Sequence, residues 1–79
     1  MGDNRYNKYQ SCLVDYCHEI KEEALEAKKR FLDEPDPFHD GYALAYHRVV
    51  DLMCQFAENF DIDLKELSLH DINPYKDLL

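Results

Sequence analysis

The chain has 79 residues and a formal net charge of −8, from 17 Asp/Glu against nine Lys/Arg. An acidic surface of this kind disfavours direct binding to nucleic acid or to an anionic membrane, and no apolar run approaches the ~20 residues of a membrane span. A chain of 79 residues suits one domain (1–79), near the lower limit at which a single core holds a fold.

The cysteine content disfavours a disulfide framework. The chain holds Cys12, Cys17 and Cys54, an odd number, and the first two stand on one predicted helix with their side chains pointing in different directions. The N-terminus is polar and lacks the basic start and apolar run of a secretory signal. We therefore expect a cytoplasmic protein whose thiols stay reduced.

The first predicted element is a helix over about residues 4–33. Its apolar side chains recur at three- and four-residue steps between Tyr6 and Phe31, and they share one side of the helix. Asp3 or Asn4 can cap its start, because a short side-chain acceptor satisfies the free N–H groups of a first turn.

Residues 33–37 separate this helix from a second one, predicted over about residues 38–60. Their two prolines cannot continue a helix, and Asp36 with Pro37 suits the N-cap and first position of the next helix, with Asp40 and Gly41 as the competing start. A connection this short places the two helices antiparallel and side by side.

The second helix has an unusually broad apolar surface. Its apolar positions cover an arc of about 160–200° at about 100° per residue, which is wider than one antiparallel neighbour can cover. We therefore expect this helix to lie between at least two neighbours. In the first helix, Val14, Leu25 and Leu32 form a second stripe that a single hairpin would leave facing outward.

The C-terminal residues predict a short helix over about 64–70 and a final turn. Asp63 and Glu66 have the spacing of a capping box, and Asn73 with Pro74 suits the start of the last turn. We expect the apolar side chains of this tail to dock across the hairpin, with the last two pinning the C-terminus: Leu64, Leu67, Leu69, Ile72, Tyr75, Leu78 and Leu79.

A tail helix about 10 Å long at 1.5 Å per residue is too short to cover the hairpin. The sequence therefore predicts an all-α fold in which two hairpins complete a four-helix bundle as a homodimer. The residues expected at the interface are Val14, Leu25, Leu32, Tyr42, Ala45, Tyr46, Val49, Val50, Leu52 and Met53.

Tyrosine is abundant on the predicted apolar surfaces. Tyr6, Tyr9 and Tyr16 lie toward the open end of the hairpin, whereas Tyr42 and Tyr46 lie near its turn. A buried tyrosine needs a partner for its hydroxyl, so tyrosine collects both at core edges and at interfaces. Both interpretations remain open from the sequence.

Two sets of His and carboxylate residues have helical spacings used by metal ligands. Asp15, His18 and Glu22 belong to the first helix, and His47 and Asp51 to the second. By helical angle both sets lie opposite the apolar surfaces, so we expect them to face solvent as weak ion pairs, and we predict no cofactor.

The sequence contains no Gly-rich phosphate loop and no serine nucleophile elbow. The leading hypothesis is therefore a small non-enzymatic interaction or accessory protein. An alternative is an acidic inhibitor, similar in size and charge to immunity proteins and antitoxins, that binds a basic protein. Residues 35–79, with nine Asp/Glu against three Lys/Arg, would supply the charge. A metal-dependent helical-bundle enzyme is the remaining hypothesis.

Overall fold

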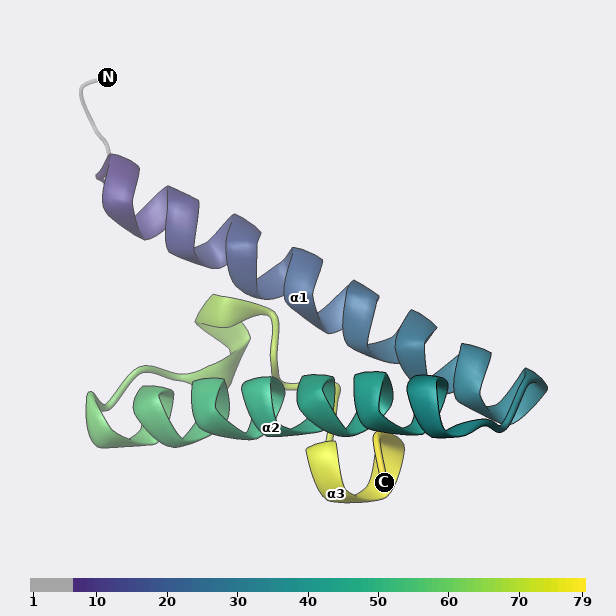
Figure 1. Ribbon diagram of the computed structural model, residues 1–79. Helices are drawn as coiled ribbons and strands as arrows, with labels where there is room; N and C mark the ends of the chain where they lie inside the picture. Colours follow the sequence, from purple (N-terminus) through teal and green to yellow (C-terminus); the bar gives the residue numbers. More distant parts are fainter. Residues whose placement is uncertain (1–6) are drawn as a thin grey trace.

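In the computed structural model, which describes residues 7–79, the protein is an antiparallel helical hairpin followed by a folded C-terminal tail (Figure 1). Helix α1 spans Lys8–Asp33 and α2 spans Pro37–Asn59, after which come the 3₁₀ helix η1, Leu64–Leu67, and the single turn α3, Pro74–Asp77. The described residues form no strand. The predicted all-α hairpin with a short C-terminal helix is confirmed.

Helix α1 begins at Lys8, later than the sequence suggested, because Asn7 caps it. The Oδ1 atom of Asn7 accepts the backbone N–H of Gln10 at 2.9 Å, and the Gln10 side chain accepts the backbone N–H of Asn7 at 2.9 Å. This reciprocal pair is a capping box. The expected caps, Asp3 and Asn4, lie outside the described residues.

Helix α2 begins as predicted. Oδ1 of Asp36 accepts the backbone N–H of His39 at 2.8 Å, and Pro37 stands in the first turn, where its missing N–H costs nothing. The helix ends at Asn59, and Asp61 then adopts a left-handed backbone conformation with φ 55°. This turn directs the chain back toward the hairpin.

Small side chains lie where α1 and α2 meet. Ala24 and Ala27 of α1 and Ala43 of α2 are buried, which lets the two backbones approach closely. The Cα trace measures 50 × 23 × 16 Å, and its smallest extent leaves no room for a third helical layer over the whole hairpin.

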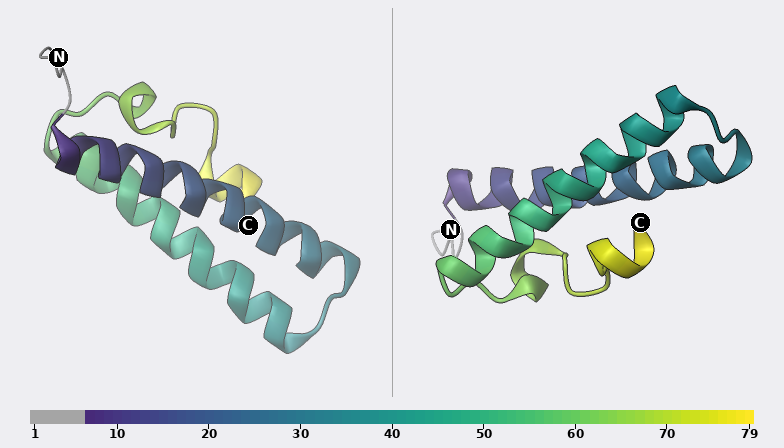
Figure 2. Two further views of the ribbon diagram at one scale, coloured as in Figure 1. Left: turned by 90° about the horizontal axis from the view of Figure 1, so that it is seen from above. Right: turned by 60° about the horizontal axis from the view of Figure 1, so that its bottom comes forward.

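The tail, residues 61–79, runs along one side of the hairpin in both views of Figure 2. Its side chains Leu67, Leu69, Ile72 and Leu78 are buried in the same core cluster as Val50 of α2. Helix α2 therefore contacts both α1 and the tail, which confirms that it lies between two neighbours.

Two polar contacts hold the tail against α1. The Lys21 ammonium, which is buried, donates to Oδ1 of Asp71 at 3.0 Å, and this hydrogen bond lowers the pKa of the Asp71 carboxyl. Lys28 donates to the backbone carbonyl of Leu79 at 2.8 Å. Of the two leucines expected to pin the C-terminus, Leu78 is buried, whereas the side chain of Leu79 is exposed.

The short helix predicted over 64–70 is a 3₁₀ helix that stops at Leu67. The expected capping box is present, since Asp63 accepts the backbone N–H of Lys65 and the Glu66 side chain accepts that of Asp63. Ser68 then takes the left-handed conformation with φ 58°, which ends the helix. The following residue, Leu69, is thereby turned into the core.

The last turn also starts as predicted. Oδ1 of Asn73 accepts the backbone N–H groups of Tyr75 and Lys76 at 3.0 and 3.1 Å, and Pro74 opens α3. Among residues 7–79, no helix combines the length and the apolar character that crossing a bilayer requires.

Candidate protein-binding face

The tail leaves an apolar groove between the first turns of α1 and the last turns of α2, where the two helices diverge (Figure 1). This open groove has a volume of about 430 Å³. Cys17 and Ala57 lie buried within it, and Ile62 and Leu67 of the tail also border it. Its remaining lining residues are Leu13, Tyr16, Val49, Leu52, Met53, Phe56 and Phe60.

At the other end of α2, near the turn of the hairpin, aromatic rings stand out from the helix. The ring centroids of Phe38 and Tyr42 are 5.9 Å apart, and those of Tyr42 and Tyr46 are 5.3 Å apart. A hydrogen bond with Tyr42, together with burial, raises the pKa of the Tyr46 hydroxyl. Phe38 and Tyr42 are exposed and are termed the aromatic ridge below.

The aromatic ridge and the open groove lie on the same stripe of α2. At about 100° per residue the stripe spans an arc of only about 80°, and it comprises Phe38, Tyr42, Ala45, Val49, Leu52, Phe56 and Phe60. Together with Tyr9, Leu13 and Tyr16 of α1, this stripe forms what we term the open face. Because exposed apolar surface is where binding sites are found, the open face is the candidate binding surface of this chain.

The predicted interface residues divide into four groups. Tyr46 is half-buried beside the ridge, whereas Leu25 and Leu32 are exposed on a different side of α1. Val50 is fully buried and Val14 packs against the same core, so neither is placed to contact a partner. The predicted residues that lie on the open face or line its groove are Tyr42, Ala45, Val49, Leu52 and Met53.

Sequence reasoning missed the part of the open face that comes from the hairpin's open end. Tyr9, Leu13, Tyr16, Phe56 and Phe60 were expected on the apolar arcs of the two helices but were not included among the interface residues, and all five are exposed. The available signal was their aromatic character, which is typical of interfaces. Tyr6, on the same predicted arc, lies outside the described residues.

The first set of candidate metal ligands is dispersed in solvent. Asp15, His18 and Glu22 are all exposed on the outer side of α1, as expected. Within residues 7–79, no three His, Cys, Asp or Glu side chains come together in an arrangement that could hold a metal ion.

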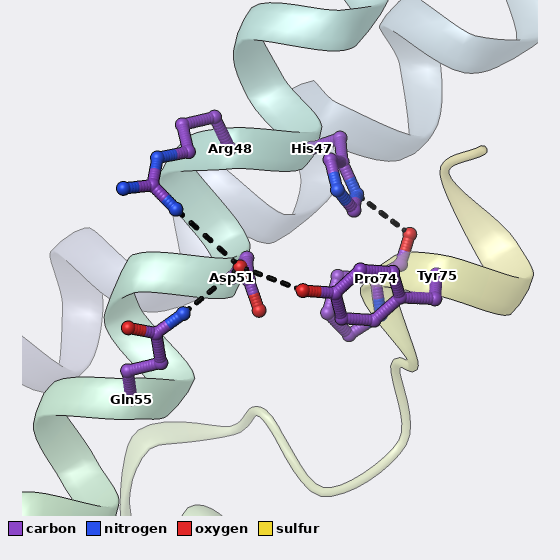
Figure 3. A network of polar contacts seen from close by, with 6 residues as sticks. All are labelled: His47, Arg48, Asp51, Gln55, Pro74 and Tyr75. Carbon is purple, nitrogen blue, oxygen red and sulfur yellow. Dashed lines mark hydrogen bonds and ion pairs between the residues drawn. The ribbon is translucent and has the colours of Figure 1, made fainter.

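The second set, His47 and Asp51, was expected to face solvent, and this prediction is wrong because the tail covers both residues (Figure 3). Asp51 is only 7% exposed. Its carboxylate accepts hydrogen bonds from Tyr75 Oη and Gln55 Nε2, each at 3.0 Å, and pairs with Arg48 at 3.6 Å. The bond to Asp51 raises the pKa of the Tyr75 hydroxyl.

His47 makes the companion contact to α3. Its Nδ1 lies 2.9 Å from the carbonyl oxygen of Pro74, which can only accept, so Nδ1 carries the proton. The His47 ring also meets the Tyr75 ring edge-on at 5.0 Å. The two residues that sequence spacing suggested as metal ligands therefore form a latch that fastens the last turn to α2.

Two of the three thiols, those of Cys17 and Cys54, lie against the core, whereas Cys12 is exposed. Burial raises the pKa of both Cys17 and Cys54, which favours the protonated and unreactive form. Cys17 lies in the core and Cys54 is half-buried against it.

Among residues 7–79, the buried polar contacts belong to the latch and to the attachment of the tail, and the buried thiols belong to the core. The open face is the extended apolar surface that remains available to another molecule. No protein-family model, no curated protein and no solved structure matches this chain.

Proposed function

We propose that this chain is a small non-enzymatic interaction or accessory protein of the cytosol, which binds another protein through its open face. The observation that carries the proposal is the open groove. The folded chain leaves Phe56 and Phe60 largely exposed in a concave apolar site, although its own tail is long enough to cover the opposite side of α2.

The shape of the groove favours a helical partner. Two diverging helices form its walls, and a third helix laid between them would complete a bundle. Buried residues with short side chains, Cys17 and Ala57, leave depth in the groove for side chains of the incoming helix. Burial of the surrounding aromatic side chains would supply the main favourable free energy, at about 25 cal/mol per Å² of apolar surface.

The polar groups support a binding role over catalysis. Asp51 and His47 are engaged in the latch, and Lys21 is paired with Asp71. These residues therefore hold the tail in place, away from the open face.

Site-specific photo-cross-linking in cells tests this function. Benzoylphenylalanine placed at Phe56 is expected to form a covalent adduct with a protein upon irradiation, which mass spectrometry of the adduct identifies. The matched control is the same group at Leu44, an exposed apolar position of α2 outside the open face. If Phe56 yields no more adduct than Leu44, the open face is not a protein-binding surface and the proposal is wrong.

A second candidate function, an acidic inhibitor of a basic protein, is favoured by one feature of α1. Asp15, Glu19, Glu22 and Glu26 are exposed at three- and four-residue steps along its outer side. Binding through this acidic row would weaken steeply as salt is added, because screening reduces charge attraction. Replacement of Glu19 and Glu22 by Gln is expected to lower the affinity for a captured basic protein. Binding that ignores salt contradicts this candidate.

A further inference from the structure

We infer that the molecule that covers the open face is a second copy of this chain, seated antiparallel so that the aromatic ridge of each copy enters the open groove of the other. The inference rests on the proposed function, since it names the partner of the same face.

The first argument is that the two halves of the open face are complementary. The groove is concave and lies at the open end of the hairpin, whereas the rings of Phe38 and Tyr42 are exposed near the turn, where they border a smaller hollow on α1. Both lie on one stripe of α2. A two-fold axis across the middle of α2 therefore brings each ridge onto the other copy's groove, which gives a closed and self-complementary interface.

The residues of the stripe have the spacing of a helix–helix seam. Successive positions are separated by alternating four and three residues, which is the period of a helix–helix seam, in the series Phe38, Tyr42, Ala45, Val49, Leu52 and Phe56. This period was not needed for packing within the chain, where the buried apolar positions of α2 are instead Ala43, Val50 and Ala57.

The spacing also selects a register. In an antiparallel seam the two kinds of heptad position face each other, so that Phe38 meets Phe56 of the second copy, Tyr42 meets its Leu52, and Ala45 meets its Val49. All six stripe residues then have an apolar partner, and the smallest side chain lies near the axis, where the two helices must approach most closely.

The exposed apolar area of the open face is close to the area that a stable dimer buries. Six aromatic residues of the open face are between 45 and 75% exposed: Tyr9, Tyr16, Phe38, Tyr42, Phe56 and Phe60. At about 200 Å² per aromatic side chain, they alone offer about 750 Å² per copy, against the ~800 Å² per partner of a stable interface.

The fourth argument is the distribution of charge on α2. Two copies of a chain with a net charge of −8 repel each other unless the contact surface avoids carboxylates. The carboxylates of α2, Asp40, Asp51 and Glu58, lie on the side that faces away from the stripe. On α1, Glu23 and Glu26 lie near Phe38 and Tyr42, in the same hollow as Arg30. The positions of α2 that flank the stripe on its outer edge are Gly41, Arg48, Gln55 and Asn59.

The first test uses purified chain and light scattering during size exclusion, at micromolar and higher concentrations. The wild type is expected to have the mass of two chains. Val49→Glu, at a position 39% exposed, is expected to weaken dimerisation by at least about a hundredfold because it places two carboxylates at the seam. Leu44→Glu, at a position 47% exposed on the same helix but off the stripe, should leave the dimer intact. Circular dichroism checks that both variants keep their helix content.

The second test fixes the orientation by cross-linking in a Cys12→Ser, Cys54→Ala background. Cys17 lines the groove and is also replaced, by Ala, so that the introduced cysteines are the only thiols. A mixture of Phe38→Cys and Phe56→Cys copies is expected to cross-link, since these positions meet in the antiparallel register. Each variant alone should not, because positions 38 and 56 are about 27 Å apart along a helix. A parallel pair would give the reverse pattern, and a dimer through another surface would give no cross-link in either sample.

Failure of this inference can be told apart from failure of the proposed function. A folded wild-type monomer at all concentrations, or either of the contrary cross-linking patterns, overturns the second copy as the occupant. The proposed function survives that result if benzoylphenylalanine at Phe56 captures a different, identified protein in cells. It fails if that position captures no protein.

Discussion

Helix α2 has two long sides that do not face α1, and the tail covers only one of them. One side carries His47, Asp51 and Cys54 and is covered by the tail through a polar latch and buried aliphatic side chains. The other carries Val49, Phe56 and further aromatic residues and is left open.

The tail is too short to cover both sides of α2, and it covers the polar one. The tail seals the side on which a buried carboxylate needs donors, since an unpaired buried charge costs several kcal/mol. It leaves open the side whose exposed groups are apolar. Exposed apolar groups are tolerated in a folded chain, and a partner can cover them. Substitutions on the two sides of α2 and in the tail test this division.

Leu69→Ala should be the most damaging change, because Leu69 is fully buried where the tail meets the hairpin. We expect a loss of about 3 kcal/mol in the free energy of unfolding, measured by urea denaturation. Phe56→Ala, on the open side, should change the unfolding free energy of the dissociated chain by less than about 1 kcal/mol. Equal losses for the two variants would mean that the open face is part of the single chain's core.

Asp51→Ala removes the acceptor at the centre of the latch. The hydroxyl of Tyr75 and the amide of Gln55 then lose their charged partner, and we expect the unfolding free energy to fall by about 2 kcal/mol. Tyr75→Phe breaks only one of these contacts and should have a smaller effect. Faster amide hydrogen exchange in the last turn of Asp51→Ala would locate the loss in the tail. Unchanged exchange there would contradict a latch.

Asn73→Ala removes the cap of α3. Its Oδ1 accepts two backbone N–H groups, so we expect a loss of about 1 kcal/mol in the free energy of unfolding. Asn73→Ser, which keeps a side-chain acceptor, is the matched control and should recover most of the loss. If Ala and Ser are equally destabilising, the side chain acts by packing and not as a cap.

The smallest effect expected is a pH dependence carried by Asp71. Its pKa is lowered in the folded chain by the hydrogen bond from Lys21, so its contribution to stability is present above the unfolded value of about 3.9. The contribution is lost as the pH falls through the lower folded value. The urea midpoint should therefore fall less steeply upon acidification for Asp71→Asn than for the wild type. Parallel curves would show that the contact with Lys21 does not stabilise the fold.

The open face could be predicted only in part. The breadth of the apolar arc on α2 indicated that one neighbour was not enough, and Tyr42, Ala45 and Val49 were correctly placed on an exposed surface. Val50 and Val14 were placed there as well but belong to the core. The position of a residue on a helical arc gives the direction of its side chain around the helix axis. It does not specify which neighbouring element packs on that side.

The sequence was sufficient to predict the two long helices and three of the four helix starts. Asp36 with Pro37, Asp63 with Glu66 and Asn73 all cap as predicted, because a cap is a contact between residues two or three positions apart. Only the tertiary structure decided which side of α2 the tail covers. That choice depends on contacts between distant parts of the chain, such as Lys21 with Asp71 and Asp51 with Tyr75, whose geometry no local spacing specifies.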